Sequence, residues 1–397
     1  MLKPNMRYNE LKDTYLFNTI YRKTNEYLKE HPDKTVLRMG VGDVSIPLCE
    51  AVIKALHDAV DDQGDTEKFH GYMPEVGYLP LRKAISGYFG KMGADISENE
   101  IFISSGACDD LCDILEIFDK DNTVMVLEPA YPEYVDTNIL AGREVIHLAA
   151  GIENDFLPAP PKDKEADIIY ICSPNNPTGA AFNRVQLKEW VDYANRIGAV
   201  IIYDAAYEIF IEDNDVPHSI FEVEGSDKCA IEICSLSKTA GFTGTRLGYT
   251  VVPKNLVREG MNLNEMWSRN RETRTNGVSY ILQKGAEAVF TDEGQKQIRR
   301  NIQVYKDNAK YFMNALDEAG IWYTGGKNSP YIWMKCPDGM TGWDFFDYLT
   351  ESIQVIGVPG DGFGECGKGY FRFSSFGTPE DTKEAANRLC RLLKGGI

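Results

Sequence analysis

The chain has 397 residues, of which 43% are hydrophobic and 26% charged, a globular composition and a length that suits two domains. Its formal net charge of -18 and pI of about 4.8 argue against nucleic acid or an anionic membrane as a partner. No apolar run approaches the roughly 20 residues that span a bilayer. The N-terminus lacks the apolar core and cleavage site of a secretory signal, so we expect a cytoplasmic protein.

Nine cysteines and five histidines are scattered along the chain, and no two cysteines form a C-x-x-C pair. A disulfide framework or a zinc site needs closer clustering of these residues. We therefore expect reduced thiols and no bound metal.

The first 45 residues lack a strand–helix rhythm, whereas short apolar runs alternate with helical stretches from about residue 100. This pattern predicts an α/β fold with a mostly parallel sheet that helices cover on both faces. The predicted strands are residues 101–103, 123–127, 167–172, 199–204, 229–234 and 247–252, and the predicted helices include one that runs through Asp110 and Leu111 to Phe118 and one at 184–197. Polar clusters follow nearly every strand, at the sheet edge where ligands bind in such folds.

Beyond residue 276 helices and strands are mixed, as in a smaller α+β domain. We expect helices at 280–290, 295–319 and 380–393, and strands at 331–334 and 370–374. The N-terminal segment is expected to join this part. The predicted small domain is therefore residues 1–46 and 282–397, and the predicted large, cofactor-binding domain is residues 47–281.

Two polar clusters carry groups that suit a pyridine cofactor as well as an ordinary turn. Asn176, in the Ser-Pro-Asn-Asn-Pro-Thr-Gly turn at 173–179, offers an amide to a ring oxygen. Asp204 ends a buried strand and either caps the next turn or keeps a pyridine nitrogen protonated. Tyr207, three residues further on, is placed to reach the same ring oxygen as Asn176.

The loop from Ser235 to Arg246 combines small hydroxyls, glycines and Lys238. Aldehyde chemistry needs a lysine held away from solvent, so that its amine is neutral and nucleophilic. A phosphate needs hydroxyls, amides and a guanidinium, which Ser235, Ser237 and Arg246 supply. Taken alone, the loop suits an exposed lysine in a glycine-rich turn equally well. Three motifs in this order, around Asn176, Asp204 and Lys238, each follow a strand and carry a group that suits the cofactor. Together they are harder to explain as ordinary turns.

With its S-P-N-N-P-T-G, Y-D-x-x-Y and S-x-S-K-x-x-G-F-x-G-x-R motifs, the sequence resembles the class I/II aminotransferases of fold type I over nearly its whole length. The resemblance implies pyridoxal 5'-phosphate as cofactor, Lys238 as the catalytic lysine that carries it, and Arg372 as the ligand of the substrate α-carboxylate. It also implies amino acid and 2-oxo acid substrates. It further implies a homodimer with shared active sites, in which Tyr72 reaches the cofactor phosphate of the neighbouring subunit. The implied cofactor-binding residues are Tyr72, Ala107, Cys108, Tyr131, Asn176, Asp204, Tyr207, Ser235, Ser237, Lys238, Arg246 and Asn276.

Further stretches, such as residues 37–43, 132–138 and 328–333, resemble one subgroup, the LL-diaminopimelate aminotransferases. The implied substrate-binding residues are Tyr15, Gly42, Glu75, Tyr131, Asn176, Asn276 and Arg372. For a substrate with a distal ammonium and carboxylate, Glu75 suits the ammonium, and Asn276 and Tyr15 supply donors. The sequence departs from the subgroup after Gly106-Ala107, where Cys108 replaces the usual lysine. We interpret Cys108 as a small buried apolar residue.

The expected reaction is transamination of LL-diaminopimelate and 2-oxoglutarate to tetrahydrodipicolinate and glutamate, a step of lysine biosynthesis. Lys238 would also act as the general base. One alternative is an aminotransferase or C–S lyase of the same fold that acts on an aromatic amino acid, alanine or cystathionine. The other is a non-catalytic, cofactor-binding regulator.

Overall fold

The structure is a computed structural model that describes residues 2–11, 15–337 and 339–395. Its centre is a seven-stranded sheet in which only β8 runs antiparallel to its neighbours. From one edge to the other the strands are β2 (Ile101–Ser104), β8 (Gly248–Val251), β7 (Ala230–Ser235), β6 (Val200–Asp204), β5 (Ile168–Cys172), β3 (Val124–Glu128) and β4 (Val145–Ala149). The predicted α/β fold class is confirmed. Every strand predicted in this region is present, and β4 was missed because its residues are only partly buried at the sheet edge.

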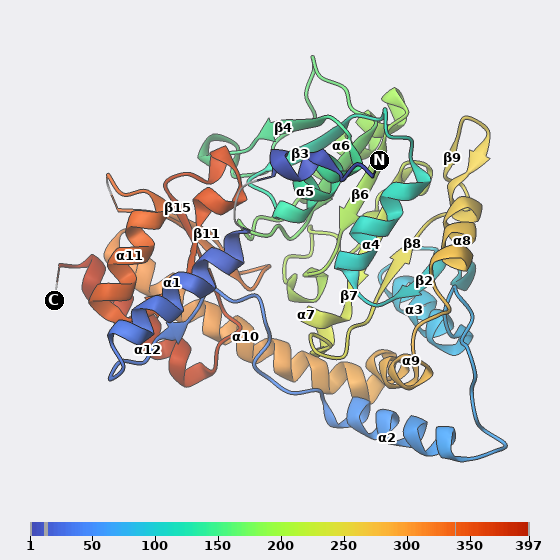
Figure 1. The fold of residues 1–397 in the computed structure, drawn as a ribbon, viewed down its shortest axis with the longest axis horizontal. Coiled ribbons are helices and arrows are strands. Elements are labelled where there is room, and N and C mark those ends of the chain that lie inside the picture. The colour runs from blue at the N-terminus through green and yellow to red at the C-terminus, as the bar shows by residue number, and fades with distance from the viewer. Residues whose placement is uncertain (1, 12–14, 338, 396–397) are drawn as a thin grey trace.

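In the sequence, the helices that lie between β2 and β8 connect strands of the sheet, and further helices precede β2 or follow β8 (Figure 1). They are α2 (Glu50–Gly64), α3 (Leu79–Lys91), α4 (Ala107–Asp113), α5 (Pro132–Ala141), α6 (Arg184–Ile197), α7 (Leu236–Ala240), α8 (Leu263–Arg274) and α9 (Tyr280–Glu287). The start of α6 is fixed because Asn183 and Gln186 cap each other reciprocally. The helix predicted to run through Asp110 and Leu111 to Phe118 is shorter than expected: α4 ends at Asp113 and gives way to a 3-10 helix at Ile114–Ile117.

The remaining elements form a second group on the left of Figure 1. A four-stranded antiparallel sheet has the order β11-β12-β15-β14, and β1 pairs with β13. The elements are α1 (Leu16–Glu30), β1 (Leu37–Arg38), β11 (Tyr323–Gly325), β12 (Tyr331–Lys335), α11 (Gly342–Ile353), β13 (Val355–Ile356), β14 (Val358–Pro359), β15 (Tyr370–Ser374) and α12 (Pro379–Leu393). A small hairpin, β9 (Val257–Arg258) and β10 (Met261–Asn262), lies before α8.

The long helix α10 (Asp292–Ala319) connects the two groups. Ile298 and Ile302 near its start belong to the hydrophobic core around the seven-stranded sheet. Phe312 and Leu316 near its end belong to a separate core with the antiparallel sheet, α11 and α12. One continuous helix therefore contributes to both cores. Among the described residues, no helix has the length and apolarity needed to cross a membrane.

Candidate active site

The predicted motifs meet because they follow strands that are neighbours in the sheet. Cys172 at the end of β5 lies opposite Asp204 at the end of β6, and Asp204 lies opposite Ile233 near the end of β7. A cavity of about 440 Å³ lies at this edge, a volume suited to a cofactor and a small substrate. Of the predicted site residues, it is lined by Tyr15, Gly42, Tyr131, Asn176, Tyr207, Lys238 and Arg372.

Lys238 lies in the short helix α7 directly after β7, largely withdrawn from solvent. Its Nζ donates a hydrogen bond to the carbonyl of Gly42. The pKa of Lys238 is lowered to about 8, mainly by burial; Asp43 on the cavity wall opposes this shift, and Arg372 and Arg246 contribute to it. The amine is therefore more often neutral near pH 7 than an exposed lysine, and only the neutral amine is nucleophilic.

Asp204 is buried at the end of β6, with 5% of its surface exposed. Its carboxyl accepts hydrogen bonds from the Tyr134 hydroxyl (2.5 Å) and from the Ala206 amide (3.0 Å). Burial raises the pKa of this carboxyl, and the two hydrogen bonds oppose that effect. Because a carboxylate offers about four lone-pair sites, it retains capacity to accept a third donor. Tyr134 was not predicted, since it contacts a residue 70 positions away in the sequence.

Arg372 is fully buried on β15, beside Asn176 from the large sheet's loop. Its Nη1 donates to Asn176 Oδ1 and its Nη2 to the Gly40 carbonyl (2.9 Å). Its Nε is buried and has no acceptor among the described residues. A buried donor without a partner is costly, and a carboxylate entering the cavity would satisfy it.

Tyr207 is buried, and its hydroxyl lies 2.9 Å from that of Tyr331 on β12. The guanidinium of Arg372 lies over the Tyr331 ring, 4.3 Å from its centroid. Tyr331 also lies so close to Gly42 that a side chain there would clash with it: a Cβ on Gly42 would lie 2.9 Å from the Tyr331 hydroxyl. Tyr331 thus links three predicted residues, although the sequence alone did not assign it a role.

A second set of polar groups lies where α4 and α7 begin. Ser235 accepts a hydrogen bond from the Ser237 amide (3.2 Å), and Arg246 Nη1 donates to Ser237 Oγ (3.2 Å). Arg246 Nη2 makes no hydrogen bond with the described residues and lies against Gly106, where a Cβ would approach it to 2.6 Å. The amide of Ala107 follows at the start of α4. Hydroxyls, a partly free guanidinium and helix-end amides around a glycine suit a phosphate group.

Cys108 corrects one expectation. Its side chain is exposed, whereas we predicted a small buried apolar residue. The reason is the orientation of α4, which turns Ala107, Asp110 and Leu111 inward and Cys108 outward. Hydrogen bonding from Cys112, one turn further on, lowers the pKa of the Cys108 thiol.

Nine predicted residues do not line the cavity: Ala107, Cys108, Asp204, Ser235, Ser237 and Arg246, described above, and Tyr72, Glu75 and Asn276. The Tyr72 side chain is 89% exposed, Asn276 is exposed, and Glu75 is half-buried. They lie on two adjoining loops, because Gly277 packs closely on the backbone of Met73.

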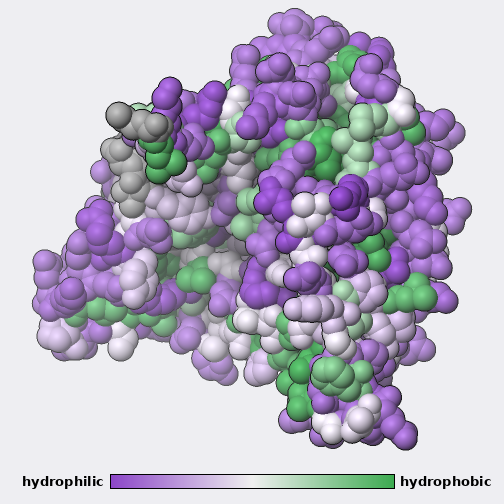
Figure 2. All heavy atoms as spheres, turned by 45° about the vertical axis from the view of Figure 1, so that its right-hand side comes forward, coloured by the Kyte–Doolittle hydropathy of each residue, from purple (hydrophilic) through white to green (hydrophobic). Residues whose placement is uncertain are grey.

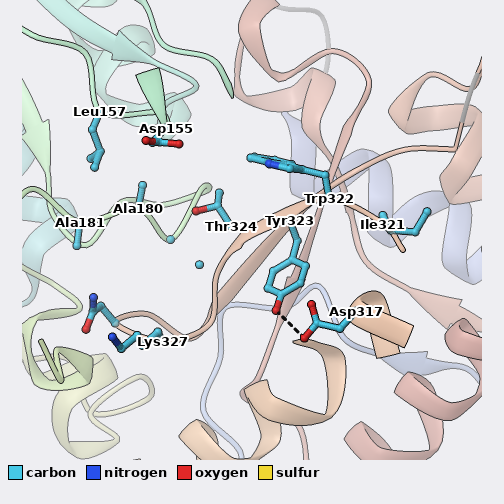
Figure 3. A pocket seen from close by; sticks show the side chains of 13 residues that line it. Asp155, Leu157, Ala180, Ala181, Asp317, Ile321, Trp322, Tyr323, Thr324 and Lys327 are labelled. Carbon is cyan, nitrogen blue, oxygen red and sulfur yellow. Dashed lines mark hydrogen bonds between the residues drawn. The ribbon is translucent and has the colours of Figure 1, made fainter. Parts of the chain in front are cut away.

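A larger hollow of about 610 Å³ lies on the other side of the 173–179 loop (Figure 3). Two of its charged groups have partners: Asp317 accepts from the Tyr323 hydroxyl (3.2 Å), and Lys327 pairs with Asp213. The backbones of Gly179, at the end of that loop, and Gly325 touch in the wall of this hollow. A Cβ on Gly179 would lie only 2.7 Å from Gly325 Cα. Because none of the predicted site residues lines it, the candidate site is the smaller cavity.

Comparisons with known proteins agree with this geometry. The family model for aminotransferases of class I and II matches residues 34–389. An LL-diaminopimelate aminotransferase of Lachnospira eligens is 49% identical over 405 positions that cover 99% of this chain and 100% of the relative. One of Lawsonia intracellularis is 46% identical with the same coverage. The solved L,L-diaminopimelate aminotransferase from Chlamydomonas reinhardtii is 38% identical, with a TM-score of 0.92 and 98% of each chain covered.

Proposed function

Because the chain belongs to the class I and II aminotransferases, a family of pyridoxal-phosphate-dependent enzymes, we propose that it transfers the amino group of LL-diaminopimelate to 2-oxoglutarate. The products are tetrahydrodipicolinate and glutamate. The observation that carries this proposal is the cavity with two opposed groups, a lysine of lowered pKa and a buried arginine with an unpaired Nε. Names and coverage of the relatives support the choice of substrate.

The residues around the cavity fit pyridoxal 5'-phosphate. Ser235, Ser237 and Arg246 would hold its phosphate together with the Ala107 and Cys108 amides, beside the room that Gly106 leaves. Asp204 would accept from the ring nitrogen, and Tyr131 would stack on the ring. Tyr207 and Asn176 would donate to the ring oxygen; Asn176 has its amide nitrogen available, because its Oδ1 is used by Arg372. When bound, the cofactor supplies an electron sink for the carbanion that transamination requires.

The chain's own residues perform the remaining work. Arg372 binds the substrate α-carboxylate through its unpaired Nε and so orients the Cα–H bond. Lys238, as a neutral amine of lowered pKa, removes the proton from Cα. Burial of both groups keeps water from competing with these contacts. We also propose that residues 1–46 and 282–397 form a small domain that closes on the large domain, residues 47–281, when Arg372 binds its carboxylate.

We further propose that two copies of the chain share their active sites. Tyr72 would reach the phosphate of the partner's cofactor, while Glu75 and Asn276 would contact its substrate. Exposed apolar side chains on α2 and the following segment support this, namely Ile53, Val60, Phe69, Tyr72 and Leu79. Figure 2 shows hydrophobic residues gathered at the lower end of the molecule, where α2 lies. Large exposed apolar patches mark protein interfaces.

A coupled assay with cofactor-loaded protein tests the proposed substrate. We expect turnover of LL-diaminopimelate with 2-oxoglutarate to exceed turnover of alanine, aromatic amino acids and cystathionine. Preferred use of one of those compounds would overturn the substrate assignment. Absence of any transamination would leave the cofactor-binding regulator as the better description.

A further inference from the structure

Asn5, Arg7 and Tyr15, which precede α1 in the sequence, lie against the two ends of α5 in the large domain. Asn5 Nδ2 donates to the Leu140 carbonyl (3.1 Å), near the end of α5. Arg7 lies beside Gly142, just beyond that helix. At the opposite end of α5, the Tyr15 hydroxyl donates to Oε1 of Glu133. This contact brings Tyr15 to the wall of the active-site cavity.

Glu133 lies in the first turn of α5, where the helix dipole favours a carboxylate. Burial raises the pKa of Glu133, while the adjacent Tyr131 and Tyr15 hydroxyls lower it. Its Oε2 is buried and accepts no hydrogen bond from the described residues. A buried acceptor without a donor is unfavourable, so this oxygen retains capacity for a further hydrogen bond.

The direction of the Tyr15 hydrogen bond determines what the cavity wall offers to a substrate. A phenol has a single O–H proton, and Tyr15 uses it on Glu133. Toward any further partner, the Tyr15 oxygen is therefore an acceptor, and the carboxylate behind it makes the corner attractive to cations. Arg372 on β15 has the opposite preference, because its unpaired Nε seeks an anion.

We propose that the Tyr15–Glu133 pair binds the side-chain ammonium of the amino acid substrate. Glu133 is then a positioning residue that determines specificity through Tyr15, and it comes from the same chain as Lys238. This inference rests on the proposed function. It changes the predicted role of Tyr15 from donor to acceptor, and it adds an acidic group to Glu75, which lies outside the cavity within one chain.

Two matched substrates test the proposal. LL-diaminopimelate and L-2-aminopimelate share their carbon chain and both carboxylates, and they differ only in the distal ammonium. We expect Glu133→Gln to lower the wild-type preference, measured as the ratio of the two kcat/KM values, by about tenfold, the scale of one hydrogen bond to a charged group. The loss should lie mainly in KM for LL-diaminopimelate. Tyr15→Phe, which keeps the ring and removes the acceptor oxygen, should shift the ratio in the same direction.

Two control variants make the result specific. Glu189→Gln, on the exposed face of α6, should leave the ratio unchanged. An equal loss for both substrates in Glu133→Gln and Tyr15→Phe would indicate a merely structural role and overturn the proposal. An unchanged ratio in Glu133→Gln, together with a collapsed ratio in Glu75→Gln, would overturn it in favour of Glu75 alone.

Failure of the proposed function is distinguishable from failure of this inference. If the wild-type enzyme does not use LL-diaminopimelate, the substrate assignment fails. L-Lysine and L-norleucine then form the matched pair with and without a terminal ammonium. A preference for L-lysine that Glu133→Gln removes would still support the ammonium site, and equal use of both would overturn it.

Discussion

The predicted site residues fall into an enclosed group and an exposed group, and the two differ in how complete they are within one chain. Lys238, Asn176, Tyr207 and Arg372 line a single cavity, and the last three are joined, directly or through Tyr331, by hydrogen bonds or ring contacts. Tyr72, by contrast, is 89% exposed, and Glu75 and Asn276 also lie outside the cavity. This difference is what we expect if, as proposed, two copies of the chain share their active sites.

The largest expected effect concerns the centre of the enclosed group. Lys238→Ala removes both the amine that would hold the cofactor and the base that takes the Cα proton. We expect kcat to fall by more than about 10⁴-fold, as when a nucleophile and general base are lost together. The visible absorbance of the lysine-bound cofactor should disappear as well. Lys383→Ala, at an exposed position of α12, is the control and should retain both signals.

Arg372→Lys tests whether the guanidinium binds a carboxylate or only supports the fold. A lysine keeps the charge but loses the Nε–H and the planar fork. We expect kcat/KM to fall about 100-fold, the cost of imperfectly pairing a buried charge, with a normal cofactor spectrum. A loss of thermal stability that accounts for the whole decrease in activity would instead assign Arg372 a structural role.

Tyr72→Phe tests the exposed group. If Tyr72 donates to the partner's cofactor phosphate, removing its hydroxyl should weaken cofactor affinity roughly 10- to 100-fold. Mixing inactive Lys238→Ala chains with Tyr72→Ala chains should then restore activity, because one site of the mixed dimer has both native residues. Unchanged affinity in Tyr72→Phe and no recovery in the mixture would show that each chain's site is independent of its partner.

The smallest expected effect is a pH dependence of the enclosed group. Burial lowers the pKa of Lys238 to about 8, so its neutral fraction increases mainly between pH 7 and 9. The initial rate at which the apoenzyme gains the absorbance of bound cofactor should therefore rise about tenfold over that interval. A rate that continues to rise steeply toward pH 10.5 would indicate an ordinary exposed lysine. The measurement uses stopped-flow absorbance at saturating pyridoxal phosphate.

The sequence predicted those features that short-range patterns encode. Buried strands such as β5 and β6 are continuous apolar runs. The groups at their ends, Asn176 and Asp204, lie at one edge of the sheet because neighbouring parallel strands end together. Residues whose role depends on distant contacts were missed. Tyr331 meets Tyr207 across 124 positions, and Glu133 meets Tyr15 across 118.

Two predictions from the sequence were wrong: the burial of Cys108 near the start of α4 and the omission of β4 at the edge of the sheet. Cys108 was predicted to be buried, but α4 turns Ala107, Asp110 and Leu111 inward and directs Cys108 outward. The edge strand β4 lacks a continuous apolar run, since only one of its two sides is covered by a neighbour. Neither feature has a local sequence signal as strong as those of the central strands.

The contact between Gly179 and Gly325 has a consequence for anyone who would redesign this enzyme. Both residues have positive φ, +69° and +84°, and their backbones touch between the two hollows. A side chain on either would displace the turn that carries Asn176, which in turn holds Arg372. Mutant libraries that vary the lining of the larger hollow should therefore exclude these two positions. A side chain placed there would weaken substrate binding by Arg372 in the smaller cavity.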